Sequence, residues 1–322
     1  MNSLQFSILA LLLSMLLSSQ CFAQESRDYV LGNTHFKQVI SETGKRYELV
    51  ITLPSSYRPG RKNSYPVLYY LDPYWDTPAL FGVYHALVYD NLIPELILVG
   101  LSYPGEKVNY GTERLRDFTP TNGPLPEGVA GNASALLKDI RQLVVPFVET
   151  NYRANKSERA LAGTSFGGLF TLYAMYEDPE FFKRYIAISP SAVWDNNYLA
   201  RRDTLYAAPH ATIPTTRHAT LNATLNAPLH ALTKTLNARL FLSYGDEEYA
   251  PFRDPIRELQ KQIAARNYKD LALQNYHMKD LRHASVKAEG YTHGLIWVWK
   301  DMAPSGKSGL EREFDILSKK VK

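Results

Sequence analysis

Apolar residues along the chain gather in short continuous runs separated by segments of helical periodicity. Continuous runs at 66–71 and 96–101 are typical of strands buried on both faces of a sheet. Similar runs at 159–162, 182–188 and 239–244 predict three more strands. Because helical segments alternate with these runs, the pattern predicts an α/β domain with a mostly parallel central sheet.

The segments between the strands have the spacing of amphipathic helices. The predicted helices cover residues 78–89, 133–149, 169–176 and 252–266. Asn132 is a plausible N-cap for the second of them. Residues 284–288 predict the last strand, and a closing helix is expected from Leu310 onward. Helices between parallel strands cover both faces of the sheet.

The chain opens with a different pattern. Residues 36–41 and 46–53 predict two strands joined by a polar turn. Gly44 lies in that turn, where a positive φ is convenient for a tight reversal. We therefore expect an antiparallel hairpin ahead of the parallel sheet.

Two stretches interrupt the alternation. Residues 102–131 are rich in Pro and Gly and predict a long irregular loop, of a kind that is often functional in compact domains. Residues 198–237 carry Thr-Leu-Asn-Ala at positions 220, 224 and 235, which indicates an inserted, locally duplicated segment. This insertion is either a cap over the edge of the sheet or a tolerated surface segment.

The N-terminus has the pattern of a secretory signal. Residues 6–17 are apolar but too few to span a bilayer, and cleavage is expected after Ala23. The signal would be residues 1–23 and the mature domain residues 24–322, in a secreted or periplasmic protein. A retained membrane anchor is the alternative. Cys21 is the single cysteine and would leave with the signal, so the mature chain would have no thiol for disulfides, catalysis or metal binding.

Charge and composition limit the classes of partner that the protein is expected to bind. The formal net charge of +4 is spread along the chain without a Lys/Arg block, so we expect neither nucleic acid nor, after signal removal, a membrane as partner. The chain contains no closely spaced His/Asp/Glu motif such as H-E-x-x-H. We therefore expect no metal and no cofactor.

The segment Gly163-Thr164-Ser165-Phe166-Gly167 carries the clearest chemical signal. It follows a predicted strand and precedes a predicted helix, which is the context of the G-x-S-x-G nucleophile elbow. A sharp turn there leaves no space for side chains two positions from the serine. The alternative is a glycine-rich turn with an incidental serine.

A serine nucleophile requires a histidine base and an orienting carboxylate. Doubly wound hydrolases place them in the order serine, acid, histidine. Here residues 246–248 follow a predicted strand, and His293 lies in a predicted Gly-flanked loop after the last one. His277 and His283 compete, but they lie in or beside a polar stretch before that strand. We predict His293 as the base.

Five segments together resemble the esterase family of α/β hydrolases that includes esterase D-like enzymes, siderophore esterases, feruloyl esterases and mycolyltransferases. The segments are Leu71-Asp72, Gly163-Thr164-Ser165-Phe166-Gly167-Gly168, Ser189-Pro190-Ser191, Gly245-Asp246-Glu247-Glu248 and Gly290-Tyr291-Thr292-His293. The resemblance runs from about residue 36 to residue 298. It implies the α/β-hydrolase fold.

The resemblance also implies roles for individual residues. Glu248 is the preferred acid, with Asp246 as second choice. The backbone N–H groups of Phe166 and Tyr74 would form the oxyanion hole. Many relatives have Asp-Gly where this chain has Asp72-Pro73, and proline offers no N–H.

Aromatic residues at the predicted loop edges are candidate substrate contacts, namely Trp75, Tyr110 and Trp194. Packing in the core or rim is their alternative role. Arg114 and Arg116 are expected to pair with acidic neighbours at positions 113 and 117, with an anionic substrate as the alternative.

The sequence thus predicts a secreted serine carboxylester hydrolase that acts on a small-molecule ester through an acyl-enzyme. Two alternatives remain open, an acyltransferase of the same fold and a non-catalytic secreted binding scaffold.

Overall fold

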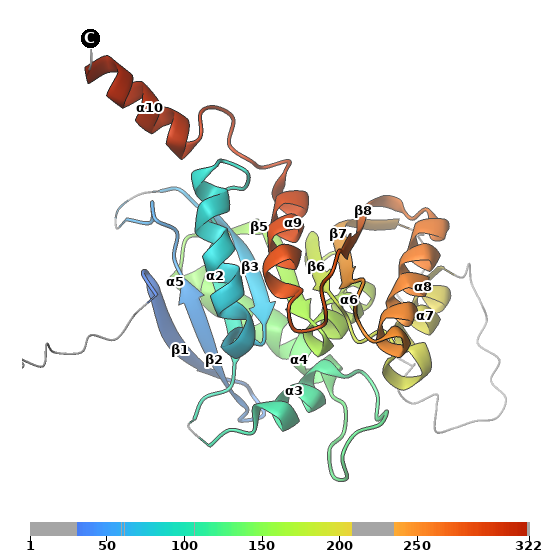
Figure 1. Ribbon diagram of the computed structural model, residues 1–322. Coiled ribbons are helices and arrows are strands. Elements are labelled where there is room, and N and C mark those ends of the chain that lie inside the picture. The colour runs from blue at the N-terminus through green and yellow to red at the C-terminus, as the bar shows by residue number, and fades with distance from the viewer. Residues whose placement is uncertain (1–30, 59, 61, 106, 208–234, 321–322) are drawn as a thin grey trace, which may run out of the picture. The chain divides into compact units, whose positions relative to one another are not determined.

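The computed structural model describes residues 31–58, 60, 62–105, 107–207 and 235–320 (Figure 1). The predicted signal segment and residues 208–234 of the predicted insertion lie outside these ranges. The compact unit that carries the fold spans Asn33–Lys322. None of its described helices is long and apolar enough to cross a membrane.

An eight-stranded sheet forms the centre of the fold. Its strands are β1 (Thr34–Ile40), β2 (Arg46–Thr52), β3 (Tyr65–Leu71), β4 (Ile97–Ser102), β5 (Ala154–Thr164), β6 (Arg184–Ile188), β7 (Thr235–Gly245) and β8 (Lys269–Met278). Their spatial order is β1-β2-β4-β3-β5-β6-β7-β8. The pairs from β4 to β8 are parallel, whereas β1 and β2 form an antiparallel hairpin and β2 joins β4 antiparallel. The predicted parallel sheet and its opening hairpin are confirmed.

Helices cover both faces of this sheet, as predicted. They are α2 (Pro73–Tyr89), α3 (Tyr110–Phe118), α4 (Ala133–Asp139), the π-helical turn η1 (Ile140–Val144), α5 (Val145–Asn151), α6 (Phe166–Glu177), α7 (Trp194–Ala207), α8 (Ala250–Arg266), α9 (Lys287–Trp299) and α10 (Gly309–Lys320). Helices α2 and α9 pack together on one face, burying Tyr84 and Trp299 (Figure 1). Helices α4 to α8 lie over the other, where Phe170 and Leu259 are buried.

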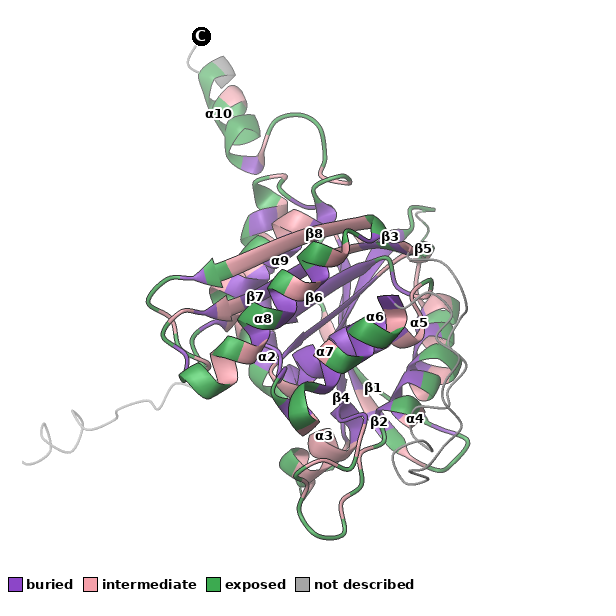
Figure 2. Ribbon diagram, turned by 90° about the vertical axis from the view of Figure 1, so that its right-hand side faces the viewer, coloured by how far each residue is buried: buried purple, intermediate pink, exposed green. Residues whose placement is uncertain are grey.

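Burial follows the pattern of the sequence. All seven residues of β3 and all five of β6 are buried (Figure 2). These are the continuous apolar runs, and each lies between two other strands with helices above and below. The edge strand β8 is mostly half-buried, because one of its sides has no neighbouring strand within the described residues.

Two sequence-based expectations about elements were wrong. The last strand is β8, not 284–288, which forms a turn and the first residues of α9. The loop 102–131 contains helix α3, whose Arg114 and Asp117 pair with partners distant in sequence. Residues 198–207 of the predicted insertion form the end of helix α7, where Leu199 is fully buried. The cap over the sheet stays a prediction, because residues 208–234 lie outside the described ranges.

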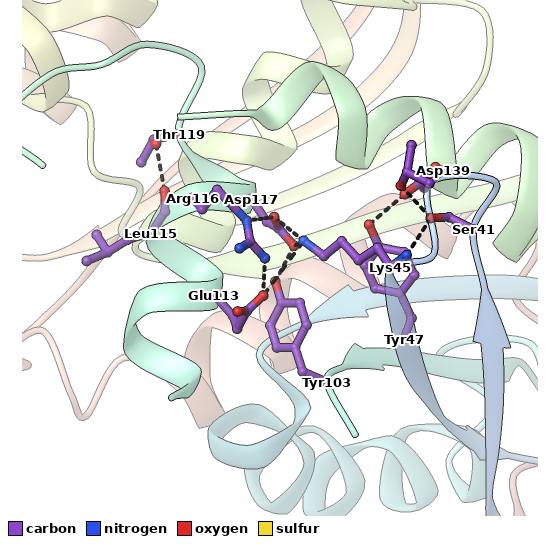
Figure 3. Close-up of polar contacts among 11 residues, drawn as sticks. Ser41, Lys45, Tyr47, Tyr103, Glu113, Leu115, Arg116, Asp117, Thr119 and Asp139 are labelled. Atoms are coloured by element: carbon purple, nitrogen blue, oxygen red, sulfur yellow. Dashed lines mark hydrogen bonds and ion pairs between the residues drawn. The ribbon is translucent and has the colours of Figure 1, made fainter. Parts of the chain in front are cut away.

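Helix α3 is held against the hairpin by a partly buried charge network (Figure 3). The carboxylate of Asp117 pairs with the ammonium of Lys45 and accepts a hydrogen bond of 2.8 Å from the Tyr103 hydroxyl. Arg116 pairs with Asp117 at 3.2 Å and with Glu113, so the pairing expected for Arg116 is confirmed. Burial, then the charge of Asp117, raises the pKa of Tyr103, which therefore remains a donor.

Replacing Asp117 by Asn should lower the free energy of unfolding by about 3 kcal/mol, because the partly buried network loses the carboxylate that pairs with both Lys45 and Arg116. Chemical denaturation measures this. Glu42→Gln is the matched control, since Glu42 and Lys138 form an exposed pair at 3.7 Å. It should cost less than about 1 kcal/mol. Equal effects of the two substitutions would contradict the assignment.

Candidate active site

Ser165 lies at the sharp turn between β5 and α6. Its backbone has φ 61° and ψ −117°, a conformation that non-glycine residues adopt at appreciable cost. A Cβ on Gly163 would lie 2.4 Å from the carbonyl carbon and oxygen of Gly167. One on Gly167 would lie 3.3 Å from the Cβ of Leu71. The strand and helix therefore approach so closely that position 163 requires glycine.

Hydrogen bonds from the neighbouring strand fix this strained residue. The N–H of Ser165 donates to the carbonyl oxygen of Ile188 at 3.0 Å. The carbonyl oxygen of Ser165 accepts from the N–H groups of Ser191 and Leu169, each at 2.9 Å. The hydroxyls of Ser165 and Ser191 lie 3.4 Å apart. The loop that follows β6 is thus attached to the nucleophile elbow.

The same loop contacts a carboxylate and a histidine. Glu248 is buried, and its Oε1 accepts a short hydrogen bond from the Ser189 hydroxyl. The Nδ1 atom of His283 lies 3.4 Å from this Oε1 and 3.3 Å from the Ser189 oxygen. The rings of His283 and Phe252 pack in a T-shaped arrangement, with centroids 4.6 Å apart. Because Nδ1 faces the acid, Nε2 remains on the other side of the ring.

One carboxylate oxygen of Glu248 can accept a further hydrogen bond. Its Oε2 is buried and has no hydrogen-bond partner among the described residues. A buried carboxylate oxygen without a partner is costly. The Nδ1 atom of His283, 3.4 Å from the other oxygen of this carboxylate, can donate to it in the tautomer that carries a proton on Nδ1, and hydrogen bonds of this kind are often long before substrate binds.

His293 does not lie where the sequence pattern placed it. It is an exposed residue within helix α9, not in a loop after a strand. Its ring stacks on that of Tyr276 in β8, with centroids 4.5 Å apart. Within the described part of the chain it makes no hydrogen bond or ion pair with Ser165 or Glu248. The predicted loop position of His293 is wrong because β8, which ends at Met278, is the last strand, and the loop after it carries His283.

Asp246, the second-choice acid, accepts hydrogen bonds from residues near it. Its Oδ1 accepts a hydrogen bond of 2.7 Å from the N–H of Asp280, and its carbonyl oxygen accepts from Arg253 at 2.8 Å. Asp246 thereby fixes the turn after β8 that leads to His283. Of the two candidate carboxylates, Glu248 is the one beside a histidine.

Two backbone N–H groups lie at the starts of helices next to Ser165. Phe166 begins α6, and Tyr74 is the second residue of α2. Among the described residues neither N–H has a hydrogen-bond partner, as expected in the first turn of a helix. Pro73 fits as the first helical residue because no N–H is required there. The turn before α6 and the turn before α2 are adjacent. Asp72 Oδ2 lies so close to Gly167 that a Cβ added to this glycine would be 3.6 Å from it.

Arg114 has a different partner from the one expected. Its guanidinium pairs with Asp72 through two hydrogen bonds of 2.9 and 2.7 Å. It also lies 5.3 Å from the ring centroid of Phe166 and 5.5 Å from that of Trp75. Burial raises the pKa of Asp72, and Arg114 opposes this shift. The pair fixes the turn at the start of α2 beside the elbow.

The candidate substrate contacts have different exposures. Trp75 is 43 % exposed and Tyr74 68 % exposed, and both rings contact Tyr110. Trp194 is buried, packs against Phe166 with centroids 5.5 Å apart and donates to Thr121 at 3.0 Å. Tyr74 and Trp75 therefore form an exposed aromatic surface beside the partly buried Tyr110, whereas Trp194 is buried against Phe166 of the elbow.

Ser189 and Ser191 belong to a segment that carries the family resemblance, but the sequence alone predicts no role for either side chain. Ser189 has φ 47° and is fully buried, which is unusual for a serine. A polar Ser-Pro-Ser after a buried strand could have signalled a site at the edge of the sheet. No group of three or more metal-ligating side chains occurs in the described ranges.

The eight-stranded sheet and the elbow define an α/β hydrolase. The sequence profile of the family described as "Putative esterase" matches residues 40–291, and the chain belongs to this family. The solved structure of the BES protein from Bacillus cereus superposes with a TM-score of 0.69 at 25% identity, over 86% of this chain and 98% of that one.

Two curated relatives are similar over shorter segments. Ferri-bacillibactin esterase BesA of Bacillus subtilis is 29% identical over 194 residues, which are 55% of this chain and 65% of the relative. A siderophore enterobactin esterase of Emericella nidulans is 34% identical over 113 residues, which are 31% of this chain and 37% of the relative. The chain thus spans less than two thirds of the length of these relatives.

Replacing Gly163 by Ala should lower the free energy of unfolding by about 1 to 3 kcal/mol or more, since its methyl group would overlap the Gly167 backbone. Gly82→Ala is the control, because Gly82 lies in α2 with open space around its Cα. That substitution should raise stability by about 0.5 to 1 kcal/mol. Thermal unfolding of both variants tests the close approach, and an unchanged Gly163→Ala protein would contradict it.

Proposed function

We propose that this protein is a serine carboxylester hydrolase that acts through an acyl-enzyme. The observation that carries the proposal is the loop Ser189–Ser191, which contacts Ser165 on one side and the Glu248–His283 pair on the other. Family membership and the fold support it. We assign the role of base to His283 in place of His293.

Each group has a distinct task in this reaction. Ser165 Oγ attacks the acyl carbon while Nε2 of His283 takes its proton. The same proton passes to the departing alcohol as the ester bond breaks, which leaves the acyl group on Ser165. Water then attacks the acyl carbon and gives a proton to Nε2 of His283. The bond between the acyl carbon and Ser165 Oγ breaks, His283 returns that proton to Oγ, and the acid is released. Glu248 stabilises the imidazolium and holds the ring with Nδ1 toward the carboxylate.

The negative charge that develops on the carbonyl oxygen requires donors already in place. We assign these to the N–H groups of Phe166 and Tyr74, which are free in the first turns of their helices. The Asp72–Arg114 pair keeps the Tyr74 turn in position. Each such donor contributes about 2.7 to 4 kcal/mol of transition-state stabilisation.

We propose siderophore-type esters as substrates, since similar proteins are described as esterases of ferri-bacillibactin and enterobactin. The exposed rings of Tyr74 and Trp75 would contact planar groups of such an ester. We also propose export of the protein, because residues 1–23 have the pattern of a secretory signal. A panel of short acyl, feruloyl and siderophore lactone esters, assayed with and without a sugar or glycerol acceptor, distinguishes substrates and hydrolysis from acyl transfer.

Ser165→Ala and His283→Ala should each lower kcat for p-nitrophenyl butyrate by about 10⁴-fold or more, because nucleophile and base act as a unit. His293→Ala is the matched control and should retain activity, since His293 is exposed and stacks on Tyr276. Steady-state kinetics on folded, purified variants measure both effects.

Full activity of Ser165→Ala, or no labelling of the wild-type protein by a fluorophosphonate probe, would reject the serine mechanism and favour a binding scaffold. Loss of activity in His293→Ala together with an active His283→Ala would return the role of base to His293.

Glu248→Gln should lower kcat by about 10³- to 10⁴-fold, because the amide cannot stabilise the imidazolium. Asp246→Asn should change kcat far less, since the Oδ1 atom of the asparagine still accepts a hydrogen bond from the N–H of Asp280. The comparison is made at saturating substrate. A larger loss in Asp246→Asn would contradict the choice of acid.

A further inference from the structure

We propose that Asp76 is a positioning residue. Its carboxylate sets the relative positions of the nucleophile Ser165, the base His283 and the oxyanion donor Tyr74. The inference rests on the proposed serine-esterase function. Asp76 lies in α2, is fully buried and touches none of the groups assigned to the reaction. It acts through the residues that hold those groups.

Three side chains from two other elements converge on this carboxylate. Oδ2 accepts hydrogen bonds from the Thr164 hydroxyl at 2.9 Å and from the Tyr291 hydroxyl at 2.6 Å. The ammonium of Lys287 lies 2.7 Å from Oδ1. Helix α2, the end of β5 and the first turns of α9 are therefore joined at a single group.

The partners are close in sequence to each part of the site. Thr164 immediately precedes the nucleophile. Lys287 comes four residues after His283, at the start of the helix that ends the histidine loop. Asp76 itself comes two residues after Tyr74. A displacement of this carboxylate would thus move all three parts relative to one another.

The hydrogen bonds and the ion pair around Asp76 hold α2, β5 and α9 together rigidly. Burial, then the charge of Asp76, raises the pKa of Tyr291, so its hydroxyl remains a donor. Lys287 supplies the opposite charge that a buried carboxylate requires. Hydrogen bonds to a charged, buried acceptor are stronger than neutral ones. The network therefore resists the movement of any single element.

The Asp76 network affects catalysis as well as stability, because it helps to hold the strained backbone of Ser165. A residue with φ 61° keeps its conformation only if its surroundings determine it fully. Main-chain hydrogen bonds fix Ser165 from β6 and from its own helix. The Thr164 hydroxyl adds a constraint from α2, the element that carries Tyr74. Reaction rates depend steeply on such placement, and about 1 Å of error costs about 10²-fold.

The test uses the full-length mature protein and p-nitrophenyl butyrate. Thr164→Val removes the hydroxyl with little change of shape and should lower kcat about 10- to 100-fold with KM unchanged. Thr164→Ser keeps the hydroxyl and should restore most of the rate. Tyr291→Phe should behave like Thr164→Val, and Asp76→Asn should lose at least as much.

Tyr176→Phe is the matched control for a purely structural effect. Tyr176 is also buried, and its hydroxyl donates at 3.0 Å to Asp203, another fully buried carboxylate. It lies in α6 eleven residues beyond Ser165, or about 16 Å along the helix. This variant should lose comparable stability and keep the wild-type kcat.

The outcomes separate this inference from the proposed function. If Thr164→Val and Tyr291→Phe lose stability as Tyr176→Phe does but keep the wild-type kcat, Asp76 has no positioning role. If Thr164→Ser is as slow as Thr164→Val, the hydroxyl is not the cause. If wild-type protein hydrolyses no ester and resists the fluorophosphonate probe, the proposed function itself fails.

Discussion

The close approach of β5 and α6 at Gly163 and Gly167 is the constraint on which the rest of the site depends. With the helix backbone against the strand, Ser165 is forced to a positive φ and presents its hydroxyl beyond the end of the sheet. The loop after β6 then supplies Ser191, whose N–H donates to the carbonyl oxygen of Ser165, and Ser189, whose hydroxyl donates to Glu248. The close approach that requires glycine at position 163 thus places Ser165 beside the loop that contacts Glu248 and His283.

The sheet supplies the remaining geometry. Parallel strands end at one edge, so the residues that follow β3, β5, β6 and β7 meet there without any long connection. Polar groups at this edge occur as coupled pairs, such as Asp72 with Arg114 and Glu248 with Ser189. Since buried charges are costly unless they are paired, these pairs keep the edge polar and rigid at once.

Much of this could be predicted from the sequence, because the central strands are continuous apolar runs and the elbow is a local motif. Ser165 and Glu248 directly follow such strands. His283 follows β8, an edge strand whose mixed pattern, Leu271 to His277, did not resemble a buried strand. Because the last strand was expected at 284–288, the loop after it was expected at His293, whereas the loop after β8 carries His283. Helix α3 was missed for a related reason, as its stability comes from Arg114 and Asp117 meeting distant partners.

The position of β8 also bears on the order in which the fold is assembled. Strand β7 must be in place before β8 can pair, and the histidine loop comes only after β8. The nucleophile, in contrast, belongs to the middle of the sheet. Under the proposed chemistry, a partly folded chain could possess its serine turn while still lacking a base. Ester cleavage would therefore begin only when β8 has joined the sheet, and would report formation of this edge of the sheet.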